Sequence, residues 1–78
     1  MTRSVFSRRY KVLCELLVKA RVSQNFTQKD VAKSIRRPQS FVSKYENAER
    51  RLDVVEFLEV ADALGIDAKS LLADIEAL

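Results

Sequence analysis

The segment IRRPQSFVSKYE, residues 35–46, carries hydrogen-bonding side chains at a spacing that could place them on one side of a helix. If a helix follows the proline, its polar side holds Gln39, Ser40, Ser43 and Lys44, and its apolar side holds Val42 and Tyr45. Glutamine can pair with adenine N6 and N7, lysine can donate to guanine O6 and N7, and serine can reach a base edge or a phosphate. The polar side therefore suits the base edges of a DNA major groove.

The elements that must position this polar side are two short helices separated by a few residues. Thr27 followed by Asp30 resembles a capping box and opens the first helix. Pro38 fits the first turn of the second helix, which runs to about Asn47. The positions expected to point into a shared core are Val31, Ala32, Ile35, Val42 and Tyr45. The pattern predicts a helix-turn-helix over about residues 27–47.

Three further helices are predicted around this motif, so that the expected fold is all-α with five helices. Ser7 could cap a first helix that runs to about Val22, and Asn25 tolerates the left-handed conformation that often ends a helix. The inner face of this helix carries Tyr10, Leu13, Cys14, Leu17 and Arg21. Cys14 is therefore expected to be a small buried apolar side chain and not a redox switch.

The remaining sequence predicts two more helices, each with an apolar stripe. Asp53 can cap a fourth helix that ends at Gly65, and Asp67 can cap a last helix over residues 68–78. The stripes consist of Val54, Phe57, Leu58, Ala61 and Leu64 in the fourth helix, and of Leu71, Leu72, Ile75 and Leu78 in the last. A last helix this apolar needs a cover, either from the first and fourth helices or from a second subunit. We expect a dimer contact around Leu71, Ile75 and Leu78.

The composition predicts one helical domain over residues 1–78 and argues against an enzyme. With one glycine, one proline and 47% hydrophobic residues, the chain lacks the turn residues that strand-rich domains need. A single cysteine excludes a disulfide framework, and the absence of histidine removes Ser-His and Cys-His catalytic arrangements and most zinc sites. We therefore expect no metal, no cofactor and no small-molecule ligand.

No stretch of the sequence resembles a targeting or membrane segment. No apolar run approaches the roughly 20 residues that span a bilayer. The N-terminal stretch MTRSVFSRRY lacks the apolar core of a signal peptide. The expected location is the cytoplasm, with no membrane partner.

The net charge of +3 hides a division between the two halves of the chain. Residues 1–51 hold 13 lysines and arginines against four acids, which gives +9, whereas residues 52–78 hold one lysine against seven acids, which gives −6. Such polarity suits a protein with one face for a polyanion and another for a different contact.

The span from about Leu17 to Leu72 resembles the helix-turn-helix domain of the lambda-type repressor and Cro family, also called the XRE family. FTQKDVAKSI is similar to the first motif helix, PQSFVSKYEN to the recognition helix, and ERRLDVVEFLEVADALGID to the continuation. The resemblance implies a five-helix domain that binds double-stranded operator DNA, usually as a homodimer, to control transcription.

The resemblance also implies roles for individual residues. The base-reading positions fall on Gln39, Ser40 and Lys44. Ser40 and the neighbouring Ser43 are weaker readers, which could serve a base edge or a phosphate. Gln28 matches a phosphate-contacting glutamine of the family. From their positions around the motif, and not from the resemblance, further DNA backbone contacts are expected from Thr27, Lys29, Arg37, Asn47, Arg50 and Arg51. Arg21 and Glu46 match a structural ion pair that ties the first helix to the end of the recognition helix.

The sequence departs from the family pattern in the turn of the motif. Arg36 stands where the family usually has glycine, so it must adopt a positive φ at a cost of about 1 kcal/mol or change the turn. Arg37 stands where an apolar residue is common, and its stem can lie along the core edge while its guanidinium reaches a phosphate. Phe41 has two interpretations, a core residue or a contact with thymine methyls, of which we favour the core.

These features favour a sequence-specific regulator, most readily a repressor that binds a palindromic operator as a homodimer. An alternative is the antitoxin of a toxin–antitoxin pair, which would use the same motif to regulate its own operon and another surface to hold a toxin. A third interpretation is a protein-interaction module that has the fold without binding DNA. RNA recognition is disfavoured because the motif exposes no aromatic platform for stacked bases.

Overall fold

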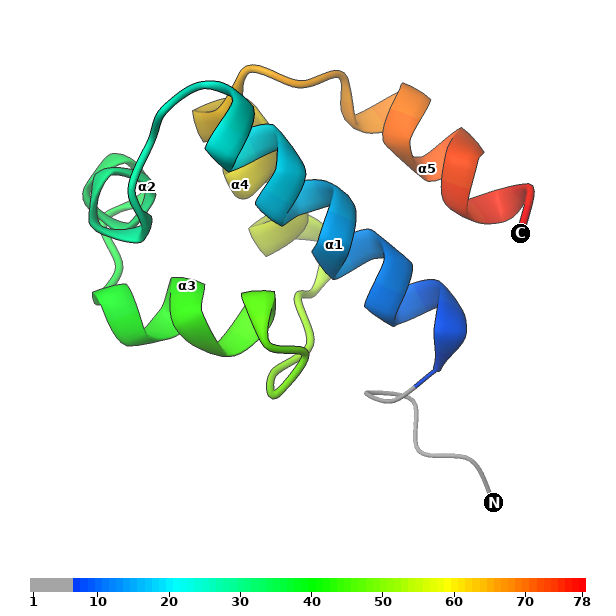
Figure 1. The fold of residues 1–78 in the computed structure, drawn as a ribbon, viewed down its shortest axis with the longest axis horizontal. Helices are drawn as coiled ribbons and strands as arrows, with labels where there is room; N and C mark the ends of the chain where they lie inside the picture. Colours follow the sequence, from blue (N-terminus) through cyan, green and yellow to red (C-terminus); the bar gives the residue numbers. More distant parts are fainter. Residues whose placement is uncertain (1–6) are drawn as a thin grey trace.

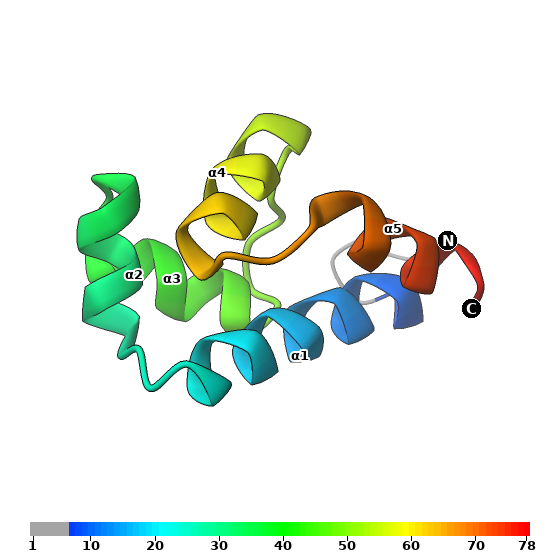
Figure 2. The ribbon, with the colours of Figure 1, turned by 90° about the horizontal axis from the view of Figure 1, so that it is seen from above.

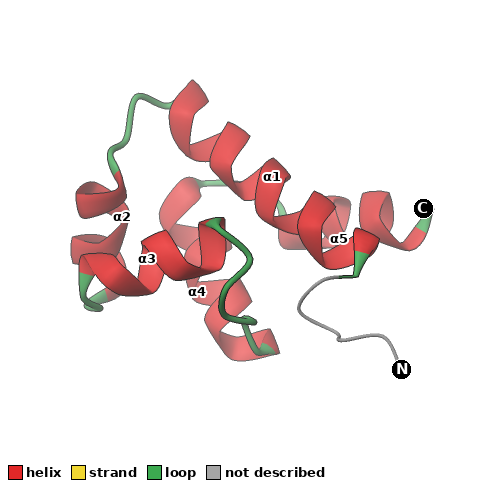
Figure 3. Ribbon diagram, turned by 60° about the horizontal axis from the view of Figure 1, so that its bottom comes forward, coloured by secondary structure: helices red, strands yellow, loops and turns green. Residues whose placement is uncertain are grey.

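The computed structural model describes residues 7–78, and within them the chain forms five α-helices and no strand (Figure 1 and Figure 3). The helices are α1 (Arg8–Ser23), α2 (Gln28–Ile35), α3 (Gln39–Glu46), α4 (Val54–Leu64) and α5 (Ala68–Glu76). The prediction of an all-α fold is therefore confirmed. Residues 1–6, which belong to the N-terminal stretch compared above with signal peptides, lie outside the described residues. Within residues 7–78, no helix has the length and apolar character of a membrane span.

The long helix α1 packs against α3, α4 and α5. The second and third helices lie at the far end of α1, and α5 lies beside its beginning (Figure 2). α2 packs against both α3 and α4, and α5 packs against α1 and α4. The helix-turn-helix thus stands at one end of the molecule and the C-terminal helix at the other.

Local hydrogen bonds set the helix ends close to the predicted positions. Ser7 accepts the amide of Tyr10 at the start of α1, and reciprocal capping boxes open α2 and α4. Pro38 is the N-cap of α3, so this helix begins one residue later than a proline in the first turn would place it. Gly65, with a φ of +68°, ends α4 as expected.

The core lies where α1, α2, α3 and α4 meet. Its buried cluster consists of Leu17, Val31, Ala32, Phe41, Val42, Tyr45, Phe57, Val60 and Leu64. Phe41 is 7% exposed and Cys14 is buried, which confirms the core interpretation of both. The inward positions of the motif are also confirmed, with Ile35 partly buried against this cluster.

The apolar stripe predicted for α4 was wrong at two positions. Val54 is 73% exposed and Leu58 is 49% exposed, whereas Val60, outside the predicted stripe, is fully buried. Phe57, Val60, Ala61 and Leu64 are spaced as i, i+3, i+4 and i+7, and they fill the side of α4 that faces the core. At about 100° per residue, Leu58 points well away from that side.

The last helix, α5, is mostly exposed, and hydrogen bonds from α1 hold its C-terminal end. None of its residues is buried, and Leu71 packs partly against the core cluster. Arg9 of α1 donates through Nη2 to the carbonyl oxygens of Glu76 and Leu78 at 3.1 and 3.2 Å. The helix ends at Glu76, two residues before the predicted end. Leu72 within it and Leu78 beyond it remain 48% and 41% exposed, so part of the predicted apolar stripe faces outward.

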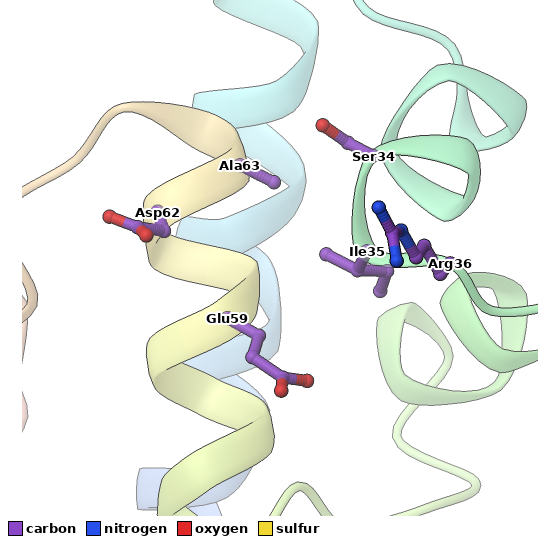
Figure 4. Close-up of a pocket in the computed structure, with 6 residues that line it drawn as sticks. All are labelled: Ser34, Ile35, Arg36, Glu59, Asp62 and Ala63. Atoms are coloured by element: carbon purple, nitrogen blue, oxygen red, sulfur yellow. The ribbon is translucent and has the colours of Figure 1, made fainter.

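Arg36 has the left-handed backbone conformation for which glycine is usual at this position of the motif. It adopts the left-handed conformation with φ 59° and ψ 45°, and the amide of Arg37 donates to the carbonyl of Ala32 at 3.0 Å. This is the backbone pattern of a helix end that normally favours glycine. Figure 4 shows Arg36 beside Ile35 at the end of α2, with Glu59 across the gap on α4.

Replacing Arg36 with glycine should raise the free energy of unfolding by about 1 kcal/mol relative to replacing it with alanine, because only glycine adopts this φ without a Cβ penalty. Both variants remove the same charge, so the difference between them reports the backbone alone. Urea unfolding followed by circular dichroism measures it. Equal stabilities of the two variants would show that the turn is not strained.

Candidate nucleic-acid interface

One side of α3 gathers the predicted base-reading residues. Gln39, Ser40 and Lys44 are exposed, and Ser43 is half-buried. On the opposite side, Val42 and Tyr45 are fully buried in the core. The helix is therefore anchored by its apolar side and presents hydrogen-bonding side chains outward, in the arrangement that the sequence predicted.

The start of α2 lies beside this outward side. Thr27 uses its hydroxyl to accept the amide of Asp30, while the carboxylate of Asp30 accepts the amide of Thr27. The bond from the Thr27 amide to the carboxylate lowers the pKa of Asp30 below its usual range. Lys29 is exposed, and Gln28 is half-buried because it faces α3.

Arg21 and Glu46 form the expected ion pair. The Nε of Arg21 lies 2.7 Å from one carboxylate oxygen of Glu46, and Nη2 lies 3.1 Å from the other. The Glu46 side chain is only 5% exposed. The same guanidinium donates to the carbonyl of Phe26 at 2.8 Å, and its bond to Glu46 raises the pKa of Arg21. The pair therefore joins α1, the loop before α2, and the end of α3.

A chain of amides extends this ion pair to the outward side of α3. Gln28 donates through Nε2 to Glu46 at 2.8 Å, and Gln39 donates through Nε2 to the Oε1 of Gln28 at 3.4 Å. Glu46 thus orients Gln28, and the Gln39 amide makes a long hydrogen bond to it. Sequence reasoning assigned Gln28 to a phosphate contact and missed this link, which depends on the packing of α2 against α3.

A second carboxylate, that of Glu56 in α4, binds two arginines beside Phe41 of α3. Glu56 of α4 accepts two hydrogen bonds from Arg50, both at 2.9 Å, and one from Arg37 at 3.4 Å. The two guanidiniums lie over the ring of Phe41, at 4.7 Å for Arg37 and 4.8 Å for Arg50. Hydrogen bonds from Arg50 and from the Asp53 amide hold the pKa of Glu56 at about 2.

Glu56 was not predicted as a functional residue. The only sequence signal was its place three residues after Asp53, which marks a capping box. Its bonds to Arg50 and Arg37 arise because the start of α4 lies beside α3, and the sequence pattern carries no sign of that. The structure thus places two arginines that we assigned to the DNA backbone, Arg37 and Arg50, in a shared cluster.

The loop between α3 and α4 is fastened to α1 by Tyr10. Its hydroxyl donates to the carbonyl of Arg50 at 2.6 Å and accepts the amide of Leu52 at 3.1 Å, and burial raises the pKa of Tyr10 to about 12. The guanidinium of Arg51 lies 4.9 Å from the centre of the Tyr10 ring. Asn47 is exposed at the start of this loop.

The residues expected at a dimer contact lie apart from this surface. Leu71, Ile75 and Leu78 belong to the C-terminal segment, which lies beside the beginning of α1, away from α2 and α3 (Figure 2). The structure therefore separates the candidate nucleic-acid interface from the candidate subunit contact.

Comparison with known proteins agrees with this geometry. The family model described as "Helix-turn-helix" matches residues 17–71. Among solved structures, an XRE-family like protein from Pseudomonas syringae pv. tomato str. DC3000 is 52% identical, with a TM-score of 0.84 over 88% of this chain and 84% of that one. A search of curated proteins gave no match.

The fold is also similar to that of a more distant protein. The restriction-modification controller protein C.Esp1396I, solved as a tetramer in complex with its natural 35 base-pair operator, is 17% identical, with a TM-score of 0.81. The match covers 91% of this chain and 93% of the controller protein. At this identity, the likeness shows a shared fold.

Replacing Arg21 with methionine should lower the free energy of unfolding by about 3 kcal/mol, because it leaves the nearly buried carboxylate of Glu46 without its cation. Chemical denaturation measures the loss. The double variant Arg21→Met, Glu46→Met removes both charges and should recover much of the stability. A single variant as stable as the native protein would mean that Glu46 is solvated and that the pair does not hold the motif together.

Proposed function

This chain belongs to the XRE family of helix-turn-helix DNA-binding proteins, and we propose that it is a transcriptional regulator that reads operator DNA with α3. One observation carries the proposal. The outward side of α3 holds Gln39, Ser40 and Lys44, while its other side is locked into the core by Val42 and Tyr45. A rigid helix with hydrogen-bonding side chains on one side matches the shape and chemistry of the major groove.

The side chains on this surface would divide the work of recognition. Gln39 suits adenine and Lys44 suits guanine, and each good pairing discriminates by about 1–3 kcal/mol against a wrong base. Ser40 and Ser43 are shorter and would contact a base edge or a phosphate. The link from Glu46 through Gln28 supports this role for Gln39, because a prepositioned amide loses less conformational freedom on binding.

The surroundings of α3 would contact the phosphates on both walls of the groove. The proposed contacts are Thr27, Gln28, Lys29, Arg37, Asn47, Arg50 and Arg51. Such contacts place the protein on the duplex and dominate affinity, but they carry no sequence information. The prediction that follows is a strong dependence of binding on salt.

We further propose that the protein acts as a homodimeric repressor on a palindromic site. The controller protein of similar fold binds its operator as a tetramer, which supports an oligomer here. Apolar side chains exposed on α4 and on the C-terminal segment, residues 68–78, would supply the contact. They are Leu72 and Leu78 beside the expected Leu71 and Ile75, together with Val54, Val55 and Leu58.

Selection of bound sequences from a random duplex pool should recover a palindromic site at moderate salt. On that site, Gln39→Ala and Lys44→Ala should each weaken binding by about 1–3 kcal/mol and relax the preference at one base pair, as fluorescence anisotropy would show. Lys69→Ala on α5 removes the same charge as Lys44→Ala and should have little effect. Recovery of no preferred sequence would refute the regulator proposal.

Sedimentation velocity should show a dimer that dissociates when a charge is introduced among the exposed apolar residues of the C-terminal segment. Leu72→Glu and Leu78→Glu should shift the protein to a monomer, because each would bury an unpaired carboxylate in the contact. Val22→Glu places the same charge on another exposed apolar position, at the end of α1, and should leave the dimer intact. If the Leu72 and Leu78 variants remain dimeric and Leu58→Glu does not, the contact lies on α4.

A further inference from the structure

Two carboxylates mark the borders of the outward side of α3. Phe41 and Glu46 are five residues apart. At about 100° per residue, they are separated by roughly 140° around the helix axis, and the buried residues of α3 lie within that angle. The outward residues fill the remaining arc between them. Glu46 supports one border through Arg21 and Gln28, and Glu56 supports the other through the arginines stacked on Phe41.

From this geometry we propose that Glu56 is a positioning residue, which holds Arg37 and Arg50 against Phe41 so that both guanidiniums meet the phosphates along one wall of the groove. The inference rests on the proposed function and adds to it a residue that does not touch DNA. The DNA partner at this border is the phosphate backbone, because the cluster carries two cations for one anion.

The burial of the three side chains supports this arrangement. The Glu56 side chain is 10% exposed, whereas those of Arg37 and Arg50 are 36% and 40% exposed. The carboxylate therefore lies inside and the guanidiniums outside. A guanidinium has five N–H groups, and among the described contacts a single nitrogen of Arg37 reaches Glu56, so most of its fork stays available to a phosphate.

A fixed cation should bind phosphate better than a free one. Arginine side chains have many rotamers, and ordering one long side chain during binding costs about two- to tenfold in affinity. Here the paired bonds from Arg50 to Glu56 and the stacking on Phe41 order the guanidiniums before DNA arrives. Since the Glu56 carboxylate has its pKa held at about 2, it stays charged at neutral pH.

The proposal predicts an effect opposite in sign to simple electrostatics. Removing a negative charge from a protein that binds a polyanion should tighten binding if the charge acts only through its field. If Glu56 positions the arginines, Glu56→Gln should weaken binding despite the added positive charge. Glutamine is also a preferred residue at this place in a capping box, so α4 should keep its start.

The experiment is a fluorescence-anisotropy titration of the native protein and variants against the selected duplex, at several salt concentrations. Glu56→Gln should bind about three- to tenfold more weakly. Glu49→Gln, which neutralises an exposed carboxylate in the loop after α3, should bind as tightly as the native protein or more tightly. Arg50→Gln should also reduce the slope of log K against log salt by about one, as loss of a phosphate contact does.

A double-mutant cycle separates positioning from a purely structural role. In a protein that already carries Arg37→Gln and Arg50→Gln, Glu56→Gln should cause no further loss of affinity, because it acts through those side chains. If Glu56→Gln does not fold, Arg50→Lys serves instead. It keeps the charge but loses the paired bonds, and it should bind more weakly than the native protein.

Tighter binding by Glu56→Gln, or native affinity of a folded Arg50→Lys variant, would overturn the inference. An equal loss on Glu56→Gln in the native and the doubly substituted backgrounds would also overturn it. All three outcomes differ from failure of the proposed function, in which the native protein itself would show no preferred sequence.

Discussion

The nearly buried carboxylate of Glu46 is the interaction on which the motif depends. Its charge requires compensation, and the partners come from separate elements: Arg21 from α1 and Gln28 from α2, while Glu46 itself lies on α3. Buried charges are stable only when they are paired and hydrogen-bonded. Glu46, together with the apolar core, therefore fixes the angle between α2 and α3 and their position relative to α1.

This anchoring matters because α3 is too short to stand alone. Helices of eight residues are marginal in water, so packing must hold this one in shape. Tyr45 is fully buried and meets Phe41 edge to face, with ring centres 5.7 Å apart, although its hydroxyl has no hydrogen-bond partner among residues 7–78. The apolar core holds one side of α3, and the ion pairs of Glu46 and Glu56 lie along its two edges. Together they hold the helix in one orientation.

The sequence was enough to predict features that depend on residues close together in the chain, such as helix caps. The caps at Ser7, Thr27, Asp53 and Asp67 follow from local chemistry, and the structure confirms them. The sequence left two possibilities for Arg36, a positive φ or a changed turn, and the structure shows the positive φ. The pairing of Glu56 with Arg37, and the link from Glu46 to Gln28, could not be predicted, because these residues meet only through tertiary packing. The exposure of Val54 and Leu58 was missed because periodicity defines an apolar side but not how far neighbouring helices cover it.

The division of charge along the sequence has a physical consequence in the fold. The basic half builds α1, α2 and α3, whereas the acidic half builds α4 and α5. A polyanion is therefore attracted by the surfaces of α1, α2 and α3 and repelled by those of α4 and α5. Glu56 is an acid of the second half that lies within the basic surface. Because Glu56 pairs with both Arg37 and Arg50, two cations face one anion there and the cluster keeps a net positive charge.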